Sequence, residues 1–334
     1  MDSRTMTAAV LRTLPADHLE ISTVLAPTVH RDDDVVLHVE ACGICGTDIH
    51  IMSGQSYMPD LPFVLGHEPV GTVVDAGAAA RHWLGKRVTI TLFTGCGVCP
   101  RCLAGDERLC PNVVSDTGVF NAWGAYATYV LVNAAQLVPV PDELTSPEAA
   151  SLVDAGATAV NSARVALATA PTNVLILGAG PIGHLCAEML AARGVPVHVV
   201  QRSAARRAAV AALGHATSAS VEEAPGPFDV VIDCTGAAAV FAGGVAALGP
   251  QGTYVLAGYA RVPEVDFGEV SHKEVVIRGI RSGRREDLVT AMDLAASRRI
   301  RLPELTCWPL PEINDALAVV RSRTVAKAII VPEP

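Results

Sequence analysis

The stretch from residue 172 to 258 alternates short apolar segments with alanine-rich segments, and this alternation constrains the fold more than any other feature. We expect NVLILGAG, VPVHVVQR, FDVVIDCTG and GTYVLAGY to be strands, and PIGHLCAEMLAARG, SAARRAAVAALG and AVFAGGVAALG to be the helices between them. Strands that alternate with helices are typical of a parallel sheet with helical crossovers. The sequence therefore predicts a doubly wound α/β domain here.

A G-x-G-x-x-G motif stands directly after the first of these strands and opens the first helix. In this context the motif is typical of a dinucleotide site. The first glycine allows a tight turn, the second lets the backbone approach a pyrophosphate, and the third lets helix and strand pack closely. The alternative is a glycine-rich turn without a ligand. The predicted site, at the helix N-terminus, comprises Gly178, Gly180, Pro181, Ile182 and Gly183.

The end of the second strand indicates which cofactor binds. NAD-binding proteins usually carry Asp or Glu there for the ribose 2′-OH. This chain has Gln201 and Arg202 instead, followed by Arg206 and Arg207. Because a guanidinium suits a 2′-phosphate, the sequence favours NADP(H) over NAD(H), with Arg202 as the main residue. In the alternative interpretation, Arg206 and Arg207 only form a solvated helix face.

The N-terminal part, residues 1–150, has a different sequence pattern. VVLHVEA, VGTVVDAG, RVTITLF and AYATYVLV are short β-branched runs between Gly, Pro and Asp, which predicts a barrel or sandwich. The texture changes after residues 139–141. A helix is then expected, with Ser146 as its N-cap and Pro147 as its first residue.

Four cysteines, which we call the cysteine cluster, stand in the spacing C-x2-C-x2-C-x7-C: Cys96, Cys99, Cys102 and Cys110. Four thiolates in one short loop can close around a tetrahedral Zn²⁺ with no open position, which is a structural site. Two disulfides or apolar packing are the alternatives. Disulfides suit small folds in oxidising compartments, whereas this chain has 334 residues, half of them apolar, and an odd number of cysteines, nine.

Composition narrows the class of protein. The net charge of −9 argues against nucleic acid as a partner. No apolar run approaches the roughly 20 residues that span a bilayer, and MDSRTMTAAVLRTLP lacks the apolar region of a signal peptide. We therefore expect a soluble, cytoplasmic protein of about two domains.

GICGTDIH, at residues 43–50, and GHE, at residues 66–68, place a cysteine, histidines and acids in the N-terminal half. A catalytic zinc needs three protein ligands and one open position. Each of these residues alone is more often structural. Together with the cysteine cluster and the nucleotide motif, they indicate a second zinc site.

In this combination the chain resembles the zinc-dependent medium-chain alcohol dehydrogenase family, through GICGTDIH, LGHEPVG, the cysteine cluster, DAGATAVNSA, GAGPIG and DCTG in order. The resemblance implies a GroES-like β-barrel catalytic domain with a structural-zinc lobe at 1–150, a Rossmann domain at 151–293, and a return to the catalytic domain at 294–334. It implies two Zn²⁺ per chain. It also implies a homodimer or homotetramer, with its contact edge near GTYVLAGY and KEVVIRG.

The resemblance implies Cys45 and His67 as ligands of the catalytic zinc. Cys42 then only packs, although its C-x-x-C spacing leaves a redox pair conceivable. Asp154 stands where many members carry Cys and some carry Asp, and is the expected third ligand. Glu68 resembles the acid beside the zinc, as a direct ligand or a nearby group, and would complete the shell if Asp154 does not.

By the same resemblance, Thr47 bonds the substrate oxygen and His50 ends a proton relay, as a hydroxyl and a histidine can. The alternative for His50 is a solvated loop histidine. Asp48 is expected to orient the loop or the histidine. Candidate pocket residues, any of which could be core, are Met52, Tyr57, Phe93 and Trp123; further cofactor residues are Thr235, Gly236, Ala257, Gly258 and Arg281.

The expected activity is reversible hydride transfer between nicotinamide and a primary or secondary alcohol, or the matching aldehyde or ketone. One alternative is a zinc-free quinone or enoyl reductase of the same superfamily, which would lack both GHE and the cysteine cluster. The other is a non-enzymatic zinc- and nucleotide-binding protein on this fold, which would have no need of Thr47 and His50.

Overall fold

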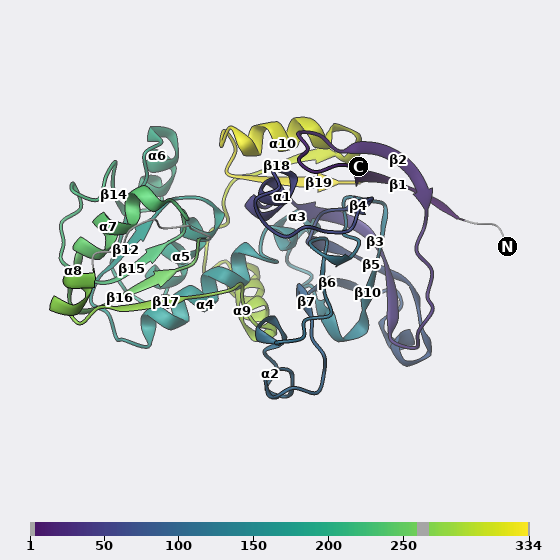
Figure 1. Ribbon diagram of the computed structural model, residues 1–334, viewed down its shortest axis with the longest axis horizontal. Helices are drawn as coiled ribbons and strands as arrows, with labels where there is room; N and C mark the ends of the chain where they lie inside the picture. The colour runs from purple at the N-terminus through teal and green to yellow at the C-terminus, as the bar shows by residue number, and fades with distance from the viewer. Residues whose placement is uncertain (1–3, 259–266, 333–334) are drawn as a thin grey trace. The chain divides into compact units, whose positions relative to one another are not determined.

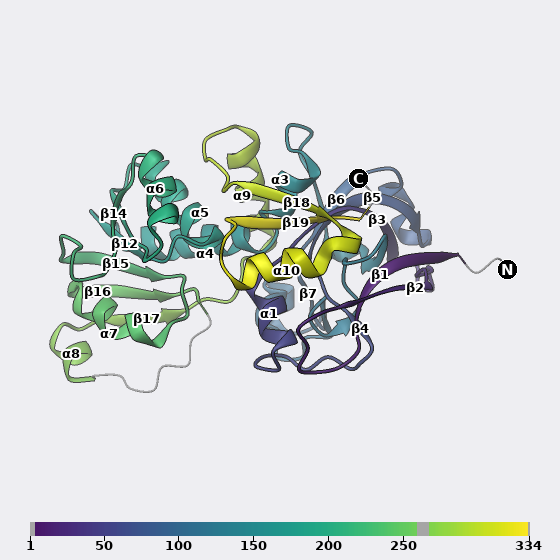
Figure 2. The same ribbon diagram turned by 90° about the horizontal axis from the view of Figure 1, so that it is seen from above.

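The computed structural model describes residues 4–258 and 267–332 (Figures 1 and 2). The chain divides into two compact units. The first holds Met1–Asp154, Arg284–Ala296 and Glu304–Pro334, and the second holds Ala155–Gly283 and Ser297–Pro303. Among the described residues, no helix combines the length and the apolar character that a membrane crossing requires.

The first unit is built on a seven-stranded sheet whose central strand, β3, pairs antiparallel with β5, β10 and β19. Apolar side chains from the N-terminal strands and from the C-terminal tail share one core. The tail therefore completes the sheet that the N-terminal strands begin. The strands of this sheet are β11 (Leu137–Pro139), β6 (Arg87–Ile90), β5 (Glu68–Ala76), β3 (Asp34–Gly43), β19 (Lys327–Val331), β18 (Leu305–Pro309) and β10 (Tyr129–Asn133).

Two small sheets and several helices complete the first unit. One sheet has the order β2–β1–β4 and the other β7–β8–β9. The strands are β1 (Thr5–Leu11), β2 (Glu20–Leu25), β4 (Phe63–Val64), β7 (Phe93–Thr94), β8 (Ser115–Thr117) and β9 (Asn121–Ala122). The helices are α1 (Gly46–Met52), α2 (Pro100–Leu103), α3 (Ser146–Ala150), α9 (Arg285–Ala296) and α10 (Ile313–Arg321).

The helix expected after residue 145 is in fact two helices, and its N-cap is Thr145 rather than Ser146. The Thr145 hydroxyl accepts from the Glu148 N–H, and the Glu148 carboxylate accepts from the Thr145 N–H at 2.8 Å. This reciprocal pair is a capping box, and it starts the helix one residue earlier than expected. Helix α3 ends at Ala150, and the chain turns before α4 begins at Ala155.

The expected domain boundaries at 150/151 and 293/294 differ from those of the compact units. The first unit extends to Asp154 and takes the chain back at Arg284, so that it includes all of α9. Arg285 holds α9 there, because its guanidinium donates to the backbone carbonyls of Ala135 and Leu137.

The second unit contains the predicted parallel sheet. Its six strands have the order β14–β13–β12–β15–β16–β17, and every pair is parallel. The order reverses at β12, and in open α/β sheets ligands bind outside the carboxyl ends of the strands at such a point. The strands are β12 (Val174–Leu177), β13 (Val197–Val200), β14 (Ala216–Ser218), β15 (Phe228–Asp233), β16 (Leu248–Leu256) and β17 (Val276–Gly279).

The strands of this sheet are covered by helices. All four residues of β12 are buried, as expected for a strand between two helical layers. Phe241 of α7 packs in one cluster with Leu175, Val231 and Tyr254 of the sheet. The helices of the second unit are α4 (Ala155–Leu167), α5 (Pro181–Ala191), α6 (Ala204–Ala212), α7 (Ala238–Ala246) and α8 (Phe267–His272).

The short segment Ser297–Pro303 joins the second unit through an ion pair between a half-exposed arginine and a buried glutamate. Arg301 donates from Nε and Nη2 to the two oxygens of Glu188 on α5, each at 2.9 Å. His215 lies 2.8 Å from the same carboxylate. Burial would raise the pKa of Glu188, but His215 and Arg301 outweigh it and lower this pKa to about 2. The pair is therefore charged across the physiological pH range.

Candidate functional site

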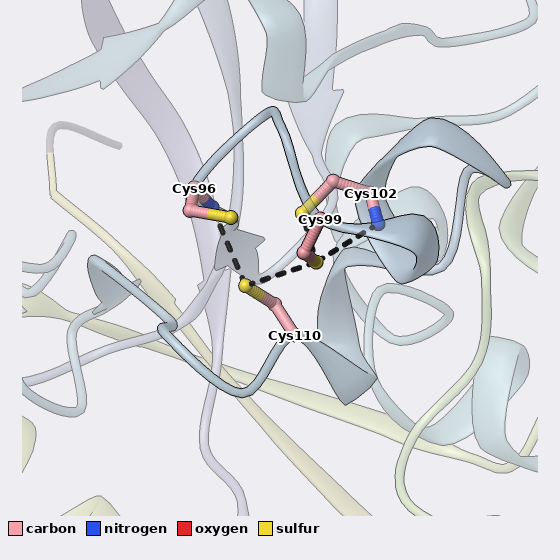
Figure 3. Close-up of side chains that lie close together, drawn as sticks. All are labelled: Cys96, Cys99, Cys102 and Cys110. Carbon is pink, nitrogen blue, oxygen red and sulfur yellow. Dashed lines mark hydrogen bonds between the residues drawn. The ribbon is translucent and has the colours of Figure 1, made fainter.

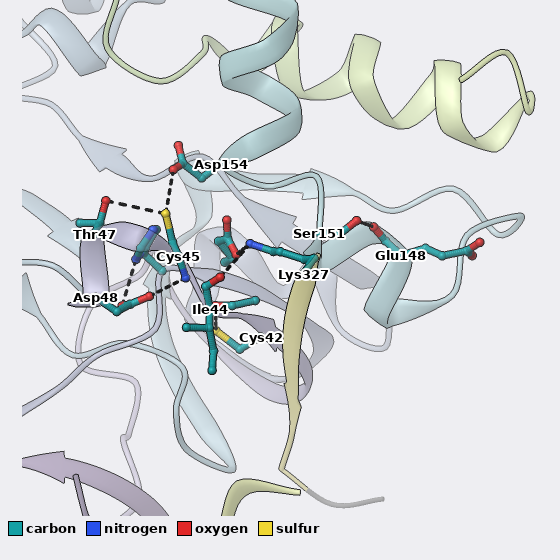
Figure 4. A network of polar contacts seen from close by, with 12 residues as sticks. Cys42, Ile44, Cys45, Thr47, Asp48, Glu148, Ser151, Asp154 and Lys327 are labelled. Atoms are coloured by element: carbon teal, nitrogen blue, oxygen red, sulfur yellow. Dashed lines mark hydrogen bonds and ion pairs between the residues drawn. The ribbon is translucent and has the colours of Figure 1, made fainter. Parts of the chain in front are cut away.

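Four donor side chains meet in the first unit. Two of them, Cys45 and Asp154, are 109 residues apart in the sequence and lie side by side in Figure 4. The four donor atoms lie within 4.8 Å of one another, and we call this group the ligand cluster: Cys45, His67, Glu68 and Asp154. Cys45 stands at the start of α1, the GHE segment leads into β5, and Asp154 ends the turn after α3. The sheet therefore assembles the four residues that the sequence proposed as zinc ligands.

Asp48, on α1, contacts two residues of the ligand cluster, His67 and Cys45. It is fully buried, and its Oδ1 lies 3.5 Å from Nδ1 of His67. Its Oδ2 accepts from the Cys45 N–H at 2.8 Å and from the Tyr126 O–H at 2.9 Å. A carboxylate on one imidazole nitrogen sets the tautomer and leaves the other nitrogen for a metal. Asp48 thus orients the loop, as expected, and the histidine beside it is His67.

Burial and the contact between His67 and Asp48 act in opposite directions on the pKa values of both residues. Burial alone would lower the pKa of His67, but the Asp48 carboxylate outweighs it and raises this pKa well above its usual range. The same contact lowers the pKa of Asp48 in spite of its burial. Burial also raises the pKa of Cys45. Since metal binding requires the thiolate, a cation in the cluster would release a proton from Cys45.

Sequence reasoning missed Lys327, the first residue of β19. It is 3% exposed and donates to Oε2 of Glu68 and, at 3.1 Å, to the carbonyl of Ile44. Gly43 makes room for this pair, because a Cβ there would collide with the Glu68 carboxylate. The available signal was a lysine that opens the apolar run KAIIV, since a buried lysine needs a paired acid.

The ligand cluster fits a zinc ion. Thiolate sulfur, imidazole nitrogen and carboxylate oxygen are the donors that zinc takes in proteins. Cys45 Sγ and Asp154 Oδ2 lie 3.5 Å apart, close to the separation of about 3.6 Å that tetrahedral bonds of about 2.3 and 2.1 Å would give. Oε1 of Glu68 is buried and has no hydrogen-bond partner among the described residues. A cation would satisfy this orphaned oxygen.

The cysteine cluster forms a second group, in which the sulfur atoms point toward one another (Figure 3). Cys99 Sγ lies 3.5 Å from the sulfur of Cys102 and 3.7 Å from that of Cys110. Bonds of about 2.3 Å to one tetrahedral zinc would separate the sulfurs by about 3.8 Å. All nine cysteines are free in the structure, which favours the zinc interpretation over the disulfide alternative. Backbone N–H donors lower the pKa of Cys96 to about 6, which favours the thiolate.

Helix α1 carries the two residues expected to handle the proton. Thr47 Oγ1 lies 3.7 Å from Cys45 Sγ, and Thr47 and His50 are three residues apart, which places them on one helix face. Both side chains are partly exposed. The arrangement provides a hydroxyl beside the ligand cluster and an imidazole one turn further along the helix.

The expected pocket residues separate into two groups. Met52 is fully buried in the core, where its sulfur accepts from Arg321, so it does not line a pocket. Phe93 is also buried, whereas Tyr57 and Trp123 are each 39% exposed. The Tyr57 ring stacks on Phe120, with centroids 6.0 Å apart. Of these four residues, Tyr57 and Trp123 therefore offer exposed aromatic surface.

In the second unit, the predicted cofactor residues all follow carboxyl ends of the parallel strands. The register aligns the last residues of five strands, namely Val200, Leu177, Asp233, Leu256 and Gly279. The loops after these residues leave from one edge of the sheet. They carry Gln201 and Arg202, the turn from Gly178 to Gly183, Thr235 and Gly236, Ala257 and Gly258, and Arg281.

The glycine turn has the geometry that the motif predicts. Gly178 has φ +96°, a left-handed conformation that favours glycine, and a Cβ at Gly183 would collide with the Gly178 carbonyl. Gly180 is the N-cap of α5 and supplies no side-chain cap. The first N–H groups of α5 are thus left for a ligand, as in phosphate sites at helix N-termini.

The three arginines after β13, Arg202, Arg206 and Arg207, have different surroundings. Arg202 is exposed, and Arg206 stands in the first turn of α6. Arg207 instead donates to the backbone carbonyls of Gln201 and Arg202, each at 2.7 Å. Arg207 therefore holds the loop in shape and is not part of a solvated face. It leaves the Arg202 guanidinium as the exposed cation at the strand end.

Two family models match the chain: the alcohol dehydrogenase GroES-like domain over residues 31–142, and the glucose dehydrogenase C-terminus over residues 144–283. An alcohol dehydrogenase from Geobacillus stearothermophilus is 30% identical over 311 residues, which cover 89% of this chain and 90% of the relative.

Solved structures are also similar. A candidate zinc-binding dehydrogenase from Sinorhizobium meliloti 1021, bound to NADP, is 29% identical with a TM-score of 0.87, covering 98% of this chain and 100% of that one. A cobalt- and zinc-bound thermostable alcohol dehydrogenase from Pyrobaculum aerophilum is 28% identical with a TM-score of 0.89 and the same coverage. The predicted fold class, a GroES-like domain with a Rossmann-type parallel-sheet domain, is confirmed.

Proposed function

We propose, from the premise that the chain belongs to the zinc-type medium-chain alcohol dehydrogenase family, that it is a zinc-dependent, NADP(H)-preferring alcohol dehydrogenase or carbonyl reductase. Family membership makes it an oxidoreductase of the alcohol dehydrogenase type. The reaction we propose is reversible hydride transfer between nicotinamide and a primary or secondary alcohol. The observation that carries the proposal is the ligand cluster, whose sulfur, nitrogen and oxygen donors lie within 4.8 Å of one another.

In this proposal Cys45, His67 and Asp154 hold the catalytic zinc, and Glu68 is the nearby acid. A bound zinc would supply a Lewis acid that makes an alcohol easier to deprotonate. The assignment of Asp154 is supported by its contact with Cys45 Sγ and by Lys327, which holds one oxygen of Glu68. The cysteine cluster would hold a second, structural zinc.

Thr47 and His50 are the proposed proton path. The Thr47 hydroxyl, beside Cys45, can donate to and accept from a substrate hydroxyl. His50, one turn further on α1, then exchanges the proton with solvent. Tyr57 and Trp123 are the proposed pocket residues, because they expose aromatic surface. These roles require no side chain beyond α1 and the loops of the first unit.

The carboxyl edge of the parallel sheet is the proposed NADP(H) site. The nicotinamide would supply the hydride chemistry, and the protein orients it. The free N–H groups of α5 suit the pyrophosphate, and Arg202 suits the 2′-phosphate. Gln201, Arg206 and Arg281 are further contacts in this proposal. The NADP bound to the Sinorhizobium meliloti relative supports the preference.

As the assembly we propose a homodimer or homotetramer. Strand β17 is an edge of the six-stranded sheet, and its Val276 and Ile277 are exposed. An exposed apolar edge strand is a ready template for pairing with another chain. Light scattering coupled to size-exclusion chromatography tests this, and a monomer at all concentrations would contradict it.

The deciding assay follows NADPH oxidation with a panel of aldehydes and ketones, before and after removal of metal. We expect turnover that chelation abolishes and Zn²⁺ restores. Cys45→Ser and Asp154→Asn should each lower kcat at least about a hundredfold, since they remove ligands, whereas Cys307→Ser changes an exposed cysteine and serves as the control. Full turnover without metal would favour the zinc-free reductase, and binding without turnover would favour the non-enzymatic alternative.

A further inference from the structure

Asp233, the last residue of β15, is a fully buried carboxylate with three donors. Its Oδ1 accepts from the Thr235 N–H at 2.8 Å and from the Thr235 hydroxyl at 2.6 Å. Its Oδ2 accepts from the Tyr254 hydroxyl at 3.0 Å. A buried carboxylate is costly unless it is well bonded, so this geometry shapes the loop that follows.

The backbone of Asp233 holds a second loop. Its carbonyl accepts from the N–H of Ala257 at 2.9 Å and from the N–H of Gly258 at 2.8 Å. The Thr235 hydroxyl in turn accepts from the Ala237 N–H at 3.0 Å, just before α7 begins. One residue therefore ties together the loop after β15 and the loop after β16.

The loop after β15 closes against the glycine turn at the switch point of the sheet, and the loop after β16 packs on the loop after β15. Asp233 pairs in register with Leu177, the residue before Gly178. A Cβ on Gly178 would lie 2.8 Å from Cγ2 of Thr235, and one on Gly258 would collide with the N–H of Gly236. A shift of the Thr235 loop would therefore disturb the turn on which a pyrophosphate would rest.

The Tyr254 hydroxyl stays protonated and therefore remains the donor to Oδ2 of Asp233. It is fully buried on β16 and packs on Phe241 of α7, with ring centroids 4.8 Å apart. Burial, and then the Asp233 charge, raises the pKa of Tyr254 well above its usual range, so the hydroxyl stays protonated. Gly244 leaves room for the ring, since a Cβ there would lie 2.8 Å from it.

We propose that Asp233 is a positioning residue of the nucleotide site, whose side chain acts through Thr235 and through Gly236, on which Gly258 packs, without touching the cofactor. It holds the two loops in the shape that receives the dinucleotide before the dinucleotide arrives. This inference rests on the proposed NADP(H) function. Preorganised loops lower the entropy cost of binding, so loosening them weakens cofactor affinity more than it affects the substrate.

The experiment measures the Kd for NADPH by calorimetry, the KM for NADPH and for the carbonyl substrate, and thermal unfolding without cofactor. Asp233→Ala should raise the Kd and KM for NADPH by roughly tenfold or more, with the carbonyl KM within about twofold. Tyr254→Phe removes one donor and should raise the Kd about threefold. Asp233→Asn keeps an acceptor for Thr235 and should stay within about threefold of wild type.

The same strand offers a matched control. Asp229, near the start of β15, is exposed and accepts from the Thr172 N–H at 2.6 Å and the Thr172 hydroxyl at 2.8 Å. It is therefore the same kind of Asp–Thr contact at the opposite end of the strand. Asp229→Ala should lower the unfolding temperature and leave the Kd for NADPH unchanged.

The possible results distinguish a failure of this inference from a failure of the proposed NADP(H) function. If wild type binds neither NADPH nor NADH, the proposed function fails, and the inference fails with it. If wild type binds NADPH and the Asp233 and Tyr254 variants bind it equally well, only the inference is overturned, because Asp233 then serves stability alone. Should Asp233→Ala not fold, Tyr254→Phe decides: a Kd for NADPH about threefold above that of wild type supports positioning, and a Kd equal to that of wild type overturns it.

Discussion

Lys327→Met would remove the only cation that the described structure pairs with the buried Glu68 carboxylate. Burial already raises the pKa of Glu68, so without Lys327 the carboxylate would either stay charged and unpaired or take up a proton, in a slot bounded by Gly43 and cut off from water. Breaking one partner of a buried ion pair costs about 3–5 kcal/mol, because the remaining charge is neither solvated nor paired. The folding equilibrium of the first unit should therefore fall by roughly 10²–10⁴-fold in metal-free protein.

The chain contains a matched control for this change. Lys273 also donates to one glutamate, Glu269, at 3.1 Å and to one backbone carbonyl, that of Ala246, at 2.8 Å. Its side chain, however, is 27% exposed. Since solvent screens such a pair, Lys273→Met should cost only about 0–1 kcal/mol. The two lysines thus differ mainly in burial.

Urea unfolding with Zn²⁺ and with chelator measures the effect. A metal near the orphaned Oε1 of Glu68 would offset part of the lost charge, so we expect a smaller loss with Zn²⁺. The double variant Lys327→Met/Glu68→Gln removes both charges and should regain most of the stability. A cost for Lys327→Met below about 1 kcal/mol, or a double variant no more stable than the single one, would refute the reasoning.

Arg202→Gln should raise the KM for NADPH by roughly 10–100-fold, because a charge-assisted bond to phosphate is worth about 1.5–3 kcal/mol; a steady-state comparison with NADH checks this, and an equal rise in both would contradict it. The pKa of Glu188 falls from 4.5 to about 2 on folding, so its pairing stabilises the protein above pH 4.5 by about 3 kcal/mol, and this is lost as the pH falls toward 2. Unfolding of wild type and Glu188→Gln should therefore differ at pH 7 and converge near pH 2. Cys99→Ser should release one zinc per chain and lower the unfolding temperature by several degrees, as measured by metal analysis and calorimetry, since a structural zinc contributes folding energy; unchanged metal content would contradict it.

Several parts of the fold and site could be predicted from nearby residues. The strand before Gly178, the turn and α5 depend on a few consecutive positions, and the structure has them where the pattern placed them. The cysteine cluster likewise lies within one short loop. The N-cap at Thr145 was missed by one residue, because Thr145 and Ser146 can both cap and only the contact with Glu148 decides between them.

The remaining features depend on segments that are far apart in the sequence. Lys327 meets Glu68 across 259 positions, because β19 completes the sheet beside β3. The bond of Arg285 to Leu137, which keeps α9 in the first unit, spans 148 positions. No local pattern predicts these pairings, and only the family resemblance implied that residues 294–334 return to the catalytic domain.

By itself the sequence determined the chemistry that is available: a parallel sheet with a phosphate-binding turn, four clustered thiols, and sulfur, nitrogen and oxygen donors suited to zinc. Only the tertiary structure decided that Lys327 pairs with Glu68, that Asp48 supports His67, and that Asp233 joins two loops. The physical reason is the separation in sequence between the residues that interact. Turns, caps and strand propensities are set by neighbours a few residues away, whereas a buried charge acquires its partner only when distant strands close into one sheet.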